Sequence, residues 1–163
     1  MVYYSFSTLK TILKWPLIVA AAVTVIRVIL ERMGAPYPIP SLFSVVMLHT
    51  ILGPIYFAVR IGRSDIPKPY ARQFALVAIY VVLARAMVLP TYWLARIFHW
   101  PENRFAGLWG PDVSDLVGFV IVPLVTALIW IVSSIIIGNA MGAVIIAALR
   151  RNKPSNEIPQ GFA

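Results

Sequence analysis

The chain has 163 residues, of which 60% are hydrophobic and only 12% are charged. In soluble domains about a quarter of the residues are charged, so this composition excludes an ordinary soluble protein and favours a chain embedded in a bilayer. The absence of cysteine excludes disulfides, thiolate nucleophiles and cysteine-ligated zinc or iron–sulfur clusters. The net charge of +8 lies mostly in loops beside apolar segments, where it orients a membrane protein, and no aromatic platform for bases accompanies it. We therefore expect no nucleic-acid partner.

Four apolar segments predict membrane-spanning helices at about residues 15–31, 42–59, 74–98 and 116–149. With short connections these segments use the whole sequence, so residues 1–163 are expected to form a single transmembrane domain. The predicted fold class is all-α: a polytopic integral membrane protein built as a four-helix transmembrane bundle with a long C-terminal helix.

The first segment follows a basic, aromatic stretch with Lys10, Lys14 and Trp15. A cleaved signal peptide would have a similar basic start and apolar core, but no small-residue cleavage site precedes Glu31, which favours a retained span. Arg27 and Glu31 are four residues apart and share one helical face. We interpret them as a local surface ion pair.

The second segment carries His49, one turn before Gly53 and Pro54, so a bend is expected near this histidine. The loop that follows is the most basic short loop of the chain. Its cations are predicted to contact acidic lipid headgroups, and they are Arg60, Arg63, Lys68 and Arg72.

The third segment carries Arg85 in the middle of its apolar run, at a depth near mid-bilayer. A charge at this depth is costly, so it marks either a binding site or an internal brace. As a brace, Arg85 would be satisfied by carbonyls and hydroxyls, and His49 would bond to a backbone oxygen. As a site, Arg85 and His49, at similar depth in neighbouring spans, would form a polar pocket for an anionic or carbonyl-bearing lipid-soluble ligand such as a quinone or phospholipid. No cofactor is predicted; haem or a pigment at His49 is the weaker alternative, since His99 at the interface is badly placed as a second axial ligand.

The last segment, residues 116–149, contains no charge. As one helix it would be about 51 Å long against a hydrocarbon core of about 30 Å. If this segment is one helix and not two, nine cations lie on one side of the membrane, and Arg32, Arg96 and Arg104 lie on the other. The nine are Lys10, Lys14, Arg60, Arg63, Lys68, Arg72, Arg150, Arg151 and Lys153. We therefore predict a multi-pass protein of the cell membrane, most simply the bacterial inner membrane, with cytoplasmic N- and C-termini.

Within this last segment Ser134, Gly138 and Gly142 follow one another at four-residue spacing. Such a strip of small residues lets another helix approach closely. That helix belongs either to the chain's own bundle or to a different subunit, and the sequence leaves both interpretations open. Asn139, beside the strip, is expected to add an interhelical hydrogen bond.

No arrangement of reactive residues typical of a membrane enzyme occurs in the sequence, and all six acids lie in loops or near helix ends. No metal site and no catalytic residue is predicted. The sequence therefore favours a non-catalytic small integral subunit that packs against a larger membrane complex, with membrane lipids and other subunits or further copies as partners. The alternative is a binder or transporter of a lipid-soluble ligand that uses Arg85 and His49.

Overall fold

The computed structural model describes residues 6–100, 105 and 112–151 of the chain. These residues form helices and no strand, in the order α1 (Phe6–Arg32), α2 (Ile39–Leu42), α3 (Val45–Met47), η1 (Leu48–Leu52), α4 (Gly53–Gly62), α5 (Pro69–Ile97), η3 (Val117–Ile121) and α6 (Val122–Arg151). They make up four units long and apolar enough to cross a membrane, because α2 to α4 act as one span and η3 continues into α6. The predicted all-α four-helix bundle is confirmed.

The clearest difference from the expected boundaries is at the start of the first span. Helix α1 begins at Phe6 rather than near residue 15 and runs through Pro16. A proline inside a membrane helix removes one backbone hydrogen bond but leaves the rest of the ladder intact, so the helix continues. Residues 116–149 form one continuous helical unit, as the single-helix interpretation expects.

Two short π-helical turns, η1 and η3, have the same origin. Each ends two residues before a proline, Pro54 in one case and Pro123 in the other. A proline ring clashes with the carbonyl four residues earlier, and a locally widened turn relieves that clash. The carbonyl four residues before Pro123 belongs to Phe119, and it accepts a hydrogen bond from Trp93 Nε1 at 2.9 Å. The bend expected beside His49 is the turn η1.

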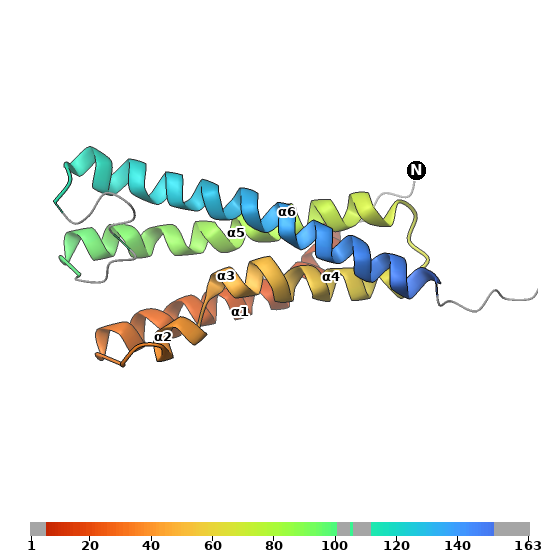
Figure 1. Ribbon diagram of the computed structural model, residues 1–163, viewed down its shortest axis with the longest axis horizontal. Helices are drawn as coiled ribbons and strands as arrows, with labels where there is room; N and C mark the ends of the chain where they lie inside the picture. Colours follow the sequence, from red (N-terminus) through yellow and green to blue (C-terminus); the bar gives the residue numbers. More distant parts are fainter. Residues whose placement is uncertain (1–5, 101–104, 106–111, 152–163) are drawn as a thin grey trace, which may run out of the picture.

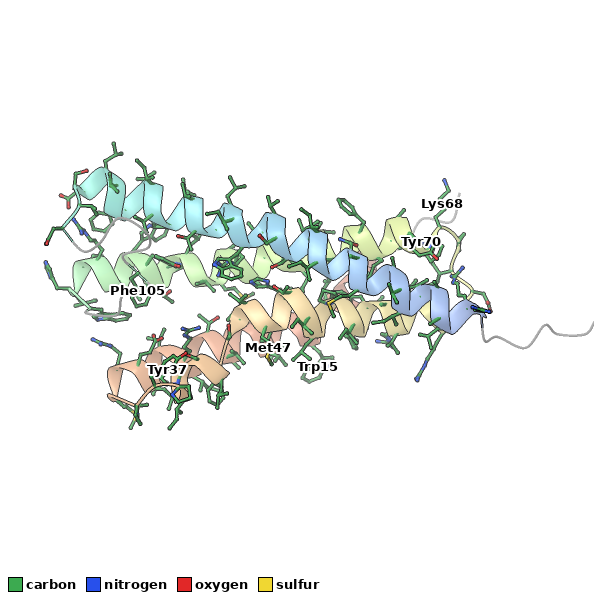
Figure 2. All side chains as sticks on the ribbon, in the orientation of Figure 1. Trp15, Tyr37, Met47, Lys68, Tyr70 and Phe105 are labelled. Carbon is green, nitrogen blue, oxygen red and sulfur yellow. The ribbon has the colours of Figure 1, made fainter. Side chains whose placement is uncertain are left out.

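The bundle has one strongly cationic end. The start of α1, the connection from α4 to α5 and the end of α6 all lie there (Figure 1). Lys68 and Tyr70 mark this end, whereas Tyr37 and Phe105 mark the opposite one (Figure 2). Arg104 and Lys153, which the charge comparison also used, fall outside the residues that the structure describes. The predicted asymmetry of charge thus corresponds to the two ends of the folded bundle.

Helix α6 crosses α5 and α4 obliquely (Figure 1) and contacts both through one row of residues at four-residue spacing. A Cβ on Gly138 would lie 2.6 Å from Pro54 Cγ, and one on Gly142 would overlap the side chain of Gln73. Further along the row, Arg150 Nη2 donates to Ile66 O at 2.8 Å and to Ser64 O at 3.3 Å. This row fastens α6 to two helices and to the loop between them.

The strip of Ser134, Gly138 and Gly142 is the centre of this row, and all three residues are buried. It therefore packs within the chain's own bundle, which leaves it closed to any other subunit. The prediction of an interhelical hydrogen bond from Asn139 is wrong, because its Nδ2 donates to Ile135 O of the same helix at 2.8 Å. The outward face of α6 is apolar and exposed, with Val144 70% accessible, as suits contact with lipid.

Replacing Gly138 by leucine tests this packing. Gly138→Leu is expected to destabilise the bundle by about 1–3 kcal/mol, because the new side chain must push Pro54 away. Val144→Leu, on the exposed face of the same helix, is the matched control and should leave stability unchanged. Reversible unfolding in mixed micelles measures both; equal effects of the two substitutions would contradict the packing.

The α4–α5 connection and the end of α6 lie at the same end of the bundle (Figure 1), which leads to a prediction about topology. Reporter fusions after Asp65 and at the C-terminus are both expected to read cytoplasmic, because the cationic end carries the excess that retains loops on that side. A C-terminal reporter on the other side of the membrane from the Asp65 reporter would contradict the four-span arrangement.

Candidate functional site

A cavity of about 700 Å³ lies in the half of the bundle away from the cationic end. Residues of α1, of the connection that leads to α3, of α5 and of α6 line it. Six lining residues carry hydroxyl groups, and they are Thr24, Tyr37, Ser41, Ser44, Tyr92 and Thr126. Two arginines, Arg27 and Arg85, line the same space, and none of the described residues that line it is acidic. The cavity is thus rich in hydrogen-bond donors and positively charged.

Arg85 forms part of the wall contributed by α5. It is only 5% exposed, and its Nη2 lies 3.5 Å from Thr126 O. The guanidinium also stands over the ring of Trp130, 5.9 Å from the ring centroid. The intramembrane charge picked out from the sequence therefore faces protein and a cavity instead of acyl chains.

Arg27, on α1, also lines the cavity. The sequence analysis interpreted Arg27 and Glu31 as a surface ion pair and did not predict this position. The Nε of Arg27 donates to Glu31 Oε1 at 3.0 Å, in the expected ion pair. Its two terminal nitrogens make no hydrogen bond to the described residues. The available signal was Thr24, three residues earlier on the same helical face, since a hydroxyl and a cation together indicate a polar face within a span.

His49 lies in η1 beside the cavity wall and is completely buried. Its Nδ1 is 2.8 Å from Ser134 Oγ and 3.3 Å from Thr50 Oγ1, and these two hydroxyls are 2.7 Å apart. The prediction that His49 bonds to a backbone oxygen is therefore wrong, because its partners are hydroxyl groups. Nε2 has no hydrogen-bond partner in the described part of the chain.

Helix α6 brings His49 and Arg85 close together. Ser134, which contacts His49, follows Trp130, which contacts Arg85, by one helical turn of about 6 Å. His49 does not line the cavity, however, so only Arg85 of the predicted pair faces the space where a ligand fits. His49 instead joins η1 to α6 through its contact with Ser134.

Ser134 and His49 share a hydrogen bond, as the serine and histidine of a hydrolase active site do, but the resemblance ends there. Ser134 is fully buried and is not part of the cavity wall, so a substrate has no access to its hydroxyl. Within the described ranges no three His, Cys, Asp or Glu side chains are grouped closely enough to hold a metal ion. His49 is not among the residues that line the cavity, and haem or pigment ligation at this histidine stays a prediction.

The cations predicted to contact lipid headgroups lie far from this cavity. Arg60, Arg63 and Lys68 are exposed at the cationic end, and Arg72 there is half-buried. Arg60 Nη1 donates to the hydroxyl of Tyr56 at 3.0 Å, which holds one guanidinium beside an aromatic ring at the helix surface. Their contact with headgroups stays a prediction.

Comparison with known proteins identifies no family model that matches this sequence, and no similar curated protein or solved structure. Any functional conclusion therefore depends on the geometry of the bundle itself.

Removing one hydroxyl tests the fastening of η1. Ser134→Ala is expected to destabilise the bundle by about 1 kcal/mol, because His49 Nδ1 keeps only the longer contact with Thr50. Ser133→Ala, at the neighbouring position of the same helix, is the control and should cost little. Unfolding in mixed micelles measures the difference; identical stability of the two variants would show that the bond between Ser134 and His49 contributes nothing.

Proposed function

We propose that this protein binds an anionic amphiphile in the membrane and holds its charged head in the Arg85 cavity. The observation that carries the proposal is a cavity of about 700 Å³ between membrane-spanning helices, whose described lining includes two arginines and six hydroxyls and no acid. Ligand sites of about 300–1,000 Å³ suit small molecules, so the space fits the head of a lipid.

Of the two ligand classes expected from the sequence, the donors favour a phospholipid over a quinone. A guanidinium offers up to five N–H donors in a planar fork that matches a phosphate group. A quinone carbonyl can accept such bonds but brings no negative charge into a positively charged site. A phosphate brings both the charge and several acceptor oxygens, and its acyl chains can remain in the bilayer.

The membrane in which the protein resides and its orientation belong to the same proposal. The excess of cations at one end supports a cytoplasmic placement of that end, and the bacterial inner membrane is the simplest host. In that orientation the cavity serves the leaflet opposite the cytoplasm. The exposed Arg60, Arg63 and Lys68 then contact acidic headgroups of the cytoplasmic leaflet.

The other expectation, a small non-catalytic subunit of a larger membrane complex, loses its residue-level support. Ser134, Gly138 and Gly142 are covered by the chain's own helices. The exposed apolar faces of α1 and α6 suit lipid as well as they suit a protein partner. The cavity, in contrast, has a chemistry of its own, so binding is the conclusion we prefer.

Replacing Arg85 tests the proposal. Arg85→Leu is expected to reduce co-purified anionic lipid by tenfold or more, since loss of a buried charged contact costs about 2–5 kcal/mol. Arg32→Leu removes the same charge from an exposed arginine that does not line the cavity, and it is the control. Lipids extracted from protein purified in mild detergent are quantified by mass spectrometry. An unchanged lipid content in the Arg85 variant would exclude the site.

A further inference from the structure

The charged groups of the cavity come from two helices that pack against each other. Arg85 belongs to α5 and Arg27 to α1, and both line the same space. Glu31 does not line it, but its carboxylate holds Arg27 Nε at 3.0 Å. These three side chains carry two positive charges and one negative charge, so the group has a net charge of +1.

The hydrogen bond to Glu31 also orients Arg27. Because Nε is the bonded atom, the two terminal nitrogens of the guanidinium are the ones left for another acceptor, and they bond to none of the described residues. Two neighbouring N–H groups in one plane suit two oxygens of one phosphate. The carboxylate of Glu31 has only 9% of its side chain exposed, so water screens its charge weakly.

From this geometry, and on the basis of the proposed function, we infer that the cavity selects a lipid head with a single negative charge, a phosphodiester without an attached cation. Arg27 is the second group that contacts this phosphate, together with Arg85. Glu31 is the positioning and specificity residue: it orients Arg27 and limits the charge that the site neutralises to one. A phosphomonoester, which carries about two charges at pH 8, would bring one more negative charge than these three side chains neutralise. A zwitterionic head would bring its own cation against the two arginines.

The test compares three lipids with identical acyl chains on the purified protein in detergent at pH 8. Phosphatidylglycerol supplies the singly charged phosphodiester, phosphatidic acid the phosphomonoester, and phosphatidylcholine the zwitterion. Native mass spectrometry measures the bound fraction of each. The unaltered protein is expected to bind phosphatidylglycerol better than phosphatidic acid by about tenfold, because an excess charge in a desolvated site is repelled strongly. It should bind phosphatidylcholine least.

Removing the negative charge should change the ratio in a defined direction. Glu31→Gln raises the net charge to +2, so it should shift the preference toward phosphatidic acid by about tenfold. Asp115→Asn is the matched control, because Asp115 also pairs with an arginine, Arg96, at the same end of the bundle but does not line the cavity. The double variant Arg27→Gln with Glu31→Gln restores a net charge of +1 and should restore the preference for phosphatidylglycerol, with weaker binding overall.

The outcomes separate this inference from the proposed function. If Glu31→Gln leaves the ratio unchanged, or Asp115→Asn shifts it equally, the role of Glu31 is wrong while binding at Arg85 stands. If inorganic phosphate added to the buffer displaces phosphatidylglycerol, the ligand is a water-soluble anion and the lipid assignment is overturned. If no lipid binds the unaltered protein, or if the Arg85→Leu variant binds each of the three lipids as well as the unaltered protein does, the proposed function fails and this inference fails with it.

Discussion

The bundle depends on one row of residues along α6. In a bilayer, apolar side chains gain little by leaving acyl chains for one another, so helices associate through close packing and a few polar contacts. Both kinds of contact occur in this row at four-residue spacing. Trp130 contacts Arg85, and Ser134 contacts His49. The glycines that follow allow α4 and α5 to pack closely. At the end of the row, Arg150 donates hydrogen bonds to the loop between those two helices. The polar contacts around Arg85 and His49 and the packing of α6 on α4 and α5 are therefore made by a single ridge of one helix.

The prolines within the spans show how the same chain satisfies its backbone without water. An unpaired carbonyl in the hydrocarbon layer costs several kcal/mol, so each break in a helix needs a local remedy. Near Pro123 the remedy is a π-helical turn whose displaced carbonyl, that of Phe119, accepts a bond from Trp93. Near Pro54 it is a second π-helical turn that carries His49 and packs tightly against Gly138 of α6. The irregular backbone thus coincides with the places where α5 and α6, or α4 and α6, are joined.

The cavity exists because α1 leans mainly on α5 while α6 packs on α4 and α5. Away from the cationic end this arrangement leaves space between α1 and α6 that no helix fills, and the short elements before η1 border it. Polar side chains line this space: Thr24 and Arg27 from α1, Arg85 from α5, and Thr126 from α6. Charge is thereby stored inside the bundle at the cost of desolvation, which a bound anion would offset.

The sequence by itself determined the features that depend on local composition. Apolar length specifies four spans, the distribution of cations distinguishes the two ends, and a charge in the middle of a span marks Arg85 as a residue that must face protein. The spacing of Ser134, Gly138 and Gly142 likewise predicts a close helix contact. Only the tertiary structure decided which helices fill that contact. It also decided that Arg27 shares a cavity with Arg85, whereas His49 contacts Ser134 and does not line that cavity. These facts depend on the angles at which helices cross, which arise from side chains far apart in the sequence and leave no periodic signal in any one segment.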